Sequence, residues 1–156
     1  MQLVFSHFTS SNESWHREAV EVYLKKIRPF QAIEVHEFKN KKNQRESSEI
    51  KKKLEAEMLL DYLKPGDWLV LFDEKATTLD SKQMSQKMNQ WLLSGKKRIV
   101  FVIGGAYGFT EEIKKRADFR ISLSAMTMNH LVAQVVALEQ IYRSFAILKN
   151  LPYHNE

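Results

Sequence analysis

Two short segments of this sequence carry residues suited to holding a small ligand. The first, residues 103–109 (IGGAYGF), directly follows an apolar run, and its glycines let a backbone turn sharply and approach a ligand closely. The second, residues 123–130 (LSAMTMNH), mixes small, hydroxyl and thioether side chains that can meet both the edge and the face of a purine. Taken alone, each segment also suits an ordinary connection between a strand and a helix.

Phosphate-loop and dinucleotide chemistry is not favoured by the first segment. It lacks the Lys-Ser/Thr pair of a phosphate loop and the G-x-G-x-x-G of a dinucleotide fingerprint. The chain has no cysteine, and none of its five histidines has metal-ligand spacing with another, so neither a metal nor thiol catalysis is indicated.

A phenol and an imidazole stand near the end of the chain, at Tyr153 and His154, after the stiffening Pro152. Both groups can transfer protons or hydrogen-bond a nucleic-acid base. The alternative is a solvated tail without a function. Glu139 and Arg143 lie one helical turn apart and are compatible with a simple helix-surface pair.

Positive charge is concentrated in one stretch of the sequence. Residues 39–53 contain seven Lys or Arg and two Glu, an excess equal to the net charge of +5 of the whole chain. Such clusters attract nucleic-acid phosphates. The alternative is a solvated helix surface that follows a basic loop.

Alternating strand and helix patterns must position these residues. Strands are predicted at residues 2–8, 32–38, 68–72, 99–103 and 119–123. Helices are predicted at residues 14–28, 47–63, 80–93, 111–116 and 131–148, with Asp80 and Thr110 as N-caps. The apolar stripe of the first helix includes Trp15 and Val22, and that of the second includes Ile50. This order predicts an α/β fold over residues 1–156 as one domain, with a mainly parallel sheet and helices on both faces.

The first residues have no basic leader or apolar core of a secretory signal, and no apolar run approaches the roughly 20 residues that span a bilayer. We therefore expect a cytoplasmic protein with no membrane partner.

Three segments in this order resemble one known family. They are residues 100–109 (VFVIGGAYGF), 121–145 (ISLSAMTMNHLVAQVVALEQIYRSF) and 152–156 (PYHNE). With them, the chain resembles the ribosomal RNA large subunit methyltransferase H family, the pseudouridine N3-methyltransferases of 23S rRNA. These belong to the SPOUT class of α/β methyltransferases. The family usually has Arg where this chain has Gln134, often has proline where it has Asn129, and often has a basic residue at the position of Asn155.

The resemblance implies a SPOUT-type α/β knot, in which the C-terminal part of the chain forms a trefoil knot that holds S-adenosylmethionine. The implied cofactor-binding residues are Phe72, Gly104, Leu123, Ser124, Ala125, Met126, Thr127 and Met128. It also implies a homodimer, with each site completed by the partner.

The implied substrate is a pseudouridine of 23S rRNA, presented by the assembled ribosome. Methyl transfer to N3 then needs alignment of the base and removal of a proton, without a metal. The catalytic candidates are His130, Arg143, Tyr153 and His154. Candidates for phosphate contacts are Lys39, Lys41, Lys42 and Arg45.

Two alternatives remain at this point. One is a SPOUT enzyme that acts on a different RNA. The other is a ribosome- or RNA-binding protein without catalysis, which would need neither the glycine turn nor the loop at residues 123–128.

Overall fold

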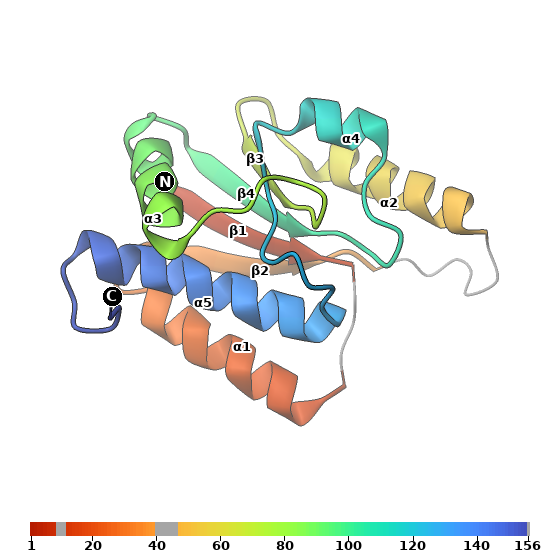
Figure 1. Cartoon of the computed structure of the whole chain (residues 1–156). Helices are drawn as coiled ribbons and strands as arrows, with labels where there is room; N and C mark the ends of the chain where they lie inside the picture. The colour runs from red at the N-terminus through yellow and green to blue at the C-terminus, as the bar shows by residue number, and fades with distance from the viewer. Residues whose placement is uncertain (9–11, 40–46, 156) are drawn as a thin grey trace.

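A parallel sheet of five strands forms the centre of the fold in the described part of the chain (Figure 1). The computed structural model describes residues 1–8, 12–39 and 47–155. The strands are β1 (Gln2–His7), β2 (Ile33–Glu37), β3 (Trp68–Phe72), β4 (Arg98–Ile103) and β5 (Phe119–Ile121). The helices are α1 (Ser14–Ile27), α2 (Ser48–Tyr62), α3 (Ser81–Leu93), α4 (Glu111–Arg116) and α5 (His130–Leu148).

The sheet order is β2-β1-β4-β3-β5, and every pairing is parallel. Strand β4 lies at the centre, with Phe101 opposite Phe5 of β1 on one side and Val70 of β3 on the other. Because all strands run the same way, their carboxyl ends meet at one edge of the sheet. The predicted α/β class with a mainly parallel sheet is confirmed. The trefoil knot stays a prediction.

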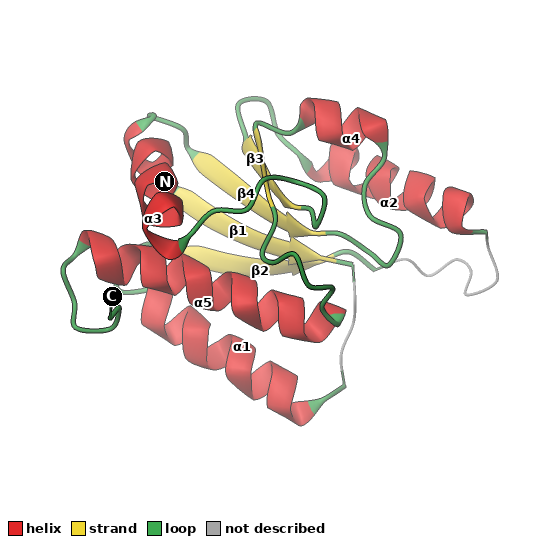
Figure 2. Cartoon of the chain, viewed as in Figure 1, coloured by secondary structure: helices red, strands yellow, loops and turns green. Residues whose placement is uncertain are grey.

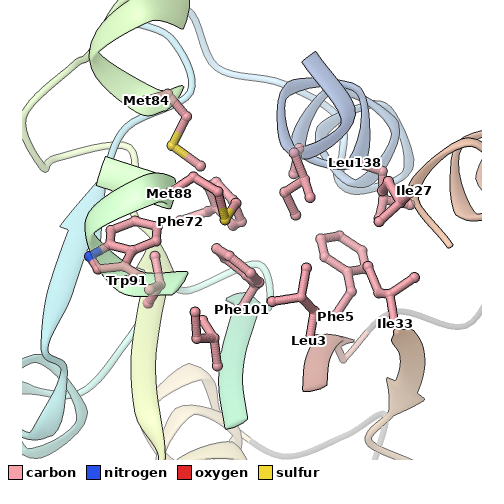
Figure 3. Packing of buried hydrophobic residues seen from close by; sticks show 14 of the residues in the cluster. Leu3, Phe5, Ile27, Ile33, Phe72, Met84, Met88, Trp91, Phe101 and Leu138 are labelled. Carbon is pink, nitrogen blue, oxygen red and sulfur yellow. The ribbon is translucent and has the colours of Figure 1, made fainter. Parts of the chain in front are cut away.

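Strand residues alternate between two hydrophobic cores. Odd-numbered residues of β1 and β4, such as Phe5 and Phe101, pack with α1, α3 and α5, as Figure 3 shows. Even-numbered residues such as Val4 and Val100 pack with α2 and α4 on the opposite face. Burial on both faces explains why the central strands read as continuous apolar runs. The predicted helical cover of both faces is therefore confirmed (Figure 2).

Helix α5 is apolar around most of its circumference because it is enclosed by other elements. By length and composition alone it qualifies as a membrane-crossing helix, so the expectation that no apolar run was long enough is wrong. In the fold it packs against α1 and α3 and contacts β4 (Figure 1). Ala137, Leu138 and Ile141 are fully buried there, which accounts for the apolar composition without a bilayer.

Helix ends follow the predicted caps closely. Asp80 and Gln83 form a reciprocal capping box at the start of α3, and the Thr110 hydroxyl accepts from the Ile113 N–H at the start of α4.

The predicted inner stripes of the first two helices are partly wrong. Trp15 and Val22 are 47% and 48% exposed, whereas Ile27 of the predicted stripe is buried and Leu24, outside it, is buried as well. In α2, Ala56 and Leu59 are buried, whereas Ile50 is exposed.

The packing of α5 gives a direct stability test. We expect Leu138→Ala to lower the free energy of unfolding by about 2–5 kcal/mol, because a fully buried side chain leaves a cavity beside the sheet. Urea denaturation measures the change. Leu93→Ala is the control, because Leu93 is 77% exposed and its loss should cost less than about 0.5 kcal/mol. Equal effects of the two changes would contradict this packing.

Candidate functional site

A cavity of about 340 Å³ lies at the carboxyl ends of three neighbouring strands. Phe72 ends β3, Ile103 ends β4, and the loop after β5 supplies Leu123 and Ser124. The volume falls within the range of roughly 300–1,000 Å³ that small-molecule sites occupy. This is also the edge at which open α/β sheets bind their ligands.

Most of the predicted cofactor-binding residues line this cavity together. They are Phe72, Gly104, Leu123, Ser124, Met126, Thr127 and Met128. Ala125 is exposed and does not line it. His130 lines the cavity as well, from the first position of α5. The structure thus brings together the glycine turn and the loop that the sequence places about 20 residues apart.

Internal hydrogen bonds hold the loop after β5. The Ser122 hydroxyl donates to the Ser124 carbonyl at 2.9 Å, and the Ser124 hydroxyl accepts from the Met126 N–H at 2.9 Å. The Asn129 side chain then caps α5 by accepting from the Leu131 N–H at 2.8 Å. Asn129, which stands where a proline is common in the family, therefore starts the helix by another means.

The glycine turn forms the opposite wall. The Gly108 N–H donates to the Gly105 carbonyl at 3.1 Å, and Gly108 has a φ of 76°, which favours glycine. A Cβ on Gly104 would lie 3.0 Å from the Phe109 ring. The turn therefore needs small residues to pack this closely against the strand end.

Several lining residues were not predicted from the sequence. They are Lys52 of α2, Lys114 of α4, and the run Asp73, Glu74 and Lys75 after β3. The last three directly follow the buried strand β3, and this position could have predicted from the sequence that they lie at the ligand-binding edge of the sheet. Lys52 and Lys114 come from the helices on the far face, so only the fold reveals them.

The other catalytic candidates form a second cluster, on the last turns of α5. Arg143 pairs with Glu139 at 2.5 Å, and Arg143 Nη1 lies 3.1 Å from His154 Nδ1. The Tyr153 hydroxyl donates to Glu139 Oε1 at 3.1 Å, and the Arg143 guanidinium stacks 4.6 Å from the Tyr153 ring centre. The segment after α5 is therefore held against the helix in an ordered arrangement.

Protonation states in this cluster follow from its contacts. Burial, together with the hydrogen bond to Glu139, raises the pKa of Tyr153 above its usual range, so the phenol stays protonated at neutral pH and acts as a donor. A guanidinium can only donate, so Nδ1 of His154 accepts from Arg143, and Nε2 carries the imidazole proton. In this arrangement neither group is a ready proton acceptor.

The two sets of catalytic candidates are not assembled within one chain. His130 and Arg143 lie thirteen residues apart on the same helix, which corresponds to about 20 Å along its axis. In Figure 1 the tail lies beside the end of α5, whereas the loop at 123–128 leads into its start. One chain therefore presents a cavity at one end and the Tyr153–His154 cluster at the other.

The proposed RNA-contacting residues are only partly described. Lys39 is exposed just after β2, while Lys41, Lys42 and Arg45 lie outside the described residues. Gln134, which replaces a family Arg, is 1% exposed, and its Oε1 lies 2.9 Å from His16 Nε2 of α1. Gln134 therefore joins α1 and α5 within the fold.

The cavity suits an organic cofactor better than an ion. Within residues 1–8, 12–39 and 47–155, no group of three or more His, Asp or Glu side chains is placed to hold a metal. Its walls combine backbone groups of the turn and loop with the Phe72 ring and methionine side chains. Such walls fit a molecule with a flat heterocycle and a polar tail, as S-adenosylmethionine has.

The parallel sheet, with a cavity formed by the loops at its edge, agrees with the family that the sequence matches. Residues 1–154 match the family model described as predicted SPOUT methyltransferase. This chain belongs to the SPOUT methyltransferase family.

Curated relatives match over nearly the whole chain. A protein of Bdellovibrio bacteriovorus named ribosomal RNA large subunit methyltransferase H is 45% identical over 155 residues, 99% of each chain. A protein of Parabacteroides distasonis with the same name is 42% identical over 142 residues, 89% of each chain. Among solved structures, the A. aeolicus TrmH/SpoU tRNA modifying enzyme is 14% identical, covering 99% of this chain and 81% of that one, with a TM-score of 0.47.

The contact between Tyr153 and Glu139 can be tested by titration. We expect Glu139→Gln to lower the pKa of Tyr153 relative to the unchanged protein, because the amide no longer opposes formation of the phenolate with a negative charge. NMR of ¹³C-tyrosine-labelled protein up to about pH 12 compares how far Tyr153 ionises in the variant and in the unchanged protein. Glu112→Gln, at an exposed position of α4, is the control. An unchanged titration in Glu139→Gln would show that burial and the contact with Tyr23 set this pKa without Glu139.

Proposed function

We propose that this chain methylates N3 of a pseudouridine in 23S rRNA, with S-adenosylmethionine as the methyl donor and the assembled ribosome as the substrate. The enzyme class comes from the family to which the chain belongs. The RNA is that of the large ribosomal subunit, as in the names of relatives up to 45% identical. The base, the atom and the ribosomal context rest on the motifs that the chain shares with the family.

The observation that carries the proposal is the cavity between the glycine turn and the loop at 123–128. The Phe72 ring and the methionines offer apolar surface, and the loop offers backbone groups in a fixed arrangement. Because residues 104 and 105 are glycines, the turn that forms the opposite wall packs closely against Phe109 and Glu55. A protein that only bound RNA would need none of these features.

The bound cofactor supplies a methyl group on a positively charged sulfur, which is already a strong electrophile. The chain must therefore align the acceptor nitrogen, exclude water and deal with one proton. His130 lies at the cavity and is the candidate nearest to the reacting atoms. The contact of Nδ1 with Arg143 leaves the Nε2–H of His154 to orient the base through a carbonyl oxygen, while the Tyr153 hydroxyl donates to Glu139 and its ring stacks on Arg143.

A homodimer would bring the two sets together, with the tail of one chain over the cavity of the other. Two features support this arrangement. The tail and the cavity lie at opposite ends of α5 in one chain. In addition, α1 and α5 expose Trp15, Val22 and Val132, which are 47%, 48% and 42% exposed and would be covered in a dimer.

The RNA would be held through phosphates rather than read base by base. Lys52, Lys75 and Lys114 surround the cavity, and Lys39 is exposed beyond β2. A protein of 156 residues has little surface for sequence recognition, which favours a target presented by the cytoplasmic ribosome.

Methyl transfer from labelled S-adenosylmethionine tests the proposal. The substrates are 70S ribosomes, 50S subunits and free 23S rRNA from cells without the endogenous activity. We expect label in a 23S pseudouridine, most with 70S ribosomes. Transfer only to another RNA would favour a SPOUT enzyme with a different target. Absence of both transfer and cofactor binding would favour the non-catalytic ribosome-binding alternative.

Completion of the site by a partner chain predicts complementation between two inactive variants. One variant lacks residues 152–156, and the other carries Gly104→Val, whose Cβ would press on Phe109. Each alone should lose at least about 90% of methyl transfer, while the first keeps cofactor binding. Mixed after joint refolding, they should regain activity, because one site in each mixed dimer has an intact cavity and an intact tail. No recovery, with mixed dimers verified by mass, would show that each chain uses its own tail.

A further inference from the structure

Glu55 is an acidic residue of α2 whose carboxylate lies against the glycine turn of the cavity. It accepts a hydrogen bond from the Gly105 N–H. The contact is close: a Cβ placed on Gly105 would overlap Glu55 Oε1 and lie 2.6 Å from Oε2. Glu55 also lines a small hollow beside the turn, together with Lys52, Phe109 and Ile113. The carboxylate thus supports the turn from the side away from the cavity.

An ionised side chain is costly at this position. Burial raises the pKa of Glu55 to about 7, against the opposing effects of the Gly105 N–H and of Lys51. Because the pKa in the folded chain exceeds the ordinary glutamate value of 4.5, folding stability falls as the pH rises from about 4.5 to about 7. A glutamine could accept from the same N–H without this cost. The carboxylate therefore reduces stability at neutral pH, which is typical of functional sites.

We propose that Glu55 is a positioning residue of the cofactor site, whose ionised carboxylate fixes the turn at residues 105–108 through the Gly105 N–H. The assignment to a cofactor rests on the proposed function, whereas the contact itself does not. Gly105 and Gly108 line the cavity, and the hydrogen bond between them closes the turn. A carboxylate that accepts from the Gly105 N–H therefore fixes the orientation of this turn, which forms the wall that a bound cofactor would contact.

The charge matters because a carboxylate is a stronger acceptor than a carboxylic acid. Cofactor affinity should accordingly rise between pH 6 and pH 8, as Glu55 loses its proton. Several other ionisable groups face this region and must be separated from Glu55 by mutation. They are Lys51 and Lys52 on α2, Lys114 on α4, Tyr107 in the turn, and Asp73, Glu74, Lys75 and His130 around the cavity.

Calorimetric binding of S-adenosylhomocysteine, the demethylated product, tests the role in the cofactor site at pH 6, 7 and 8. For the unchanged protein we expect tighter binding at pH 8 than at pH 6 by up to about tenfold. Glu55→Gln should show little dependence on pH, and Glu55→Ala should bind about tenfold more weakly at pH 8. Glu57→Gln, at an exposed position of the same helix, is the control and should follow the unchanged protein. Retention of the full pH dependence in Glu55→Gln would overturn the proposal.

Two measurements without cofactor separate this proposal from the enzymatic one. The amide NMR signal of Gly105 should titrate with a midpoint near 7 in the unchanged protein and not in Glu55→Gln. The melting temperature of Glu55→Gln should exceed that of the unchanged protein at pH 8 and approach it at pH 5. An amide that does not titrate would overturn the role of Glu55. A titrating amide in a protein that binds no S-adenosylhomocysteine would instead contradict the proposed function and the assignment to a cofactor.

Discussion

Parallel pairing of all five strands is the constraint on which the rest of this structure depends. A parallel sheet needs a crossover after each strand, so helices cover both faces and the inner strands β1, β3 and β4 are buried on both sides. The same pairing directs all carboxyl ends to one edge. The connections after β3, β4 and β5 therefore lie together, although their residues are spread over about 50 positions of the chain. The cavity follows from this edge rather than from any single motif.

The sequence predicted the elements best where one physical signal dominates. Strand β3 runs from Trp68 to Phe72 as expected, because a strand buried on both faces leaves an uninterrupted apolar run. The capping box at Asp80 was equally clear, because its side-chain chemistry is local. The inner face of α1 was harder to predict. Its periodicity showed a helix and predicted the buried Ile27, but Trp15 and Val22 are exposed and Leu24 is buried, because tertiary packing decides which apolar residues face inward.

The same distinction applies to the candidate site. The glycine turn and the loop at 123–128 could be found from sequence, because both follow predicted strands and match family motifs. Glu55 and Lys52 could not, because α2 precedes the turn by about 50 residues and reaches it only through the fold. Departures from the family pattern also acquire a physical reason only in three dimensions. Asn129 caps α5, and Gln134 pairs with His16 between two helices.

Helix α5 acts as a rigid spacer between the cavity and the cluster of Tyr153 and His154. Its start contributes His130 to the cavity, and its last turns hold Tyr153 and His154 through Glu139 and Arg143. Full burial of Leu138 and Ile141 fixes the helix against the sheet, so bending it to close a separation of about 20 Å would expose this core. Contacts within the tail also oppose its release, because Glu139 would lose a hydrogen bond and Arg143 a stacked ring. A reaction that needs both regions is therefore achieved at lower cost by joining two chains than by refolding one.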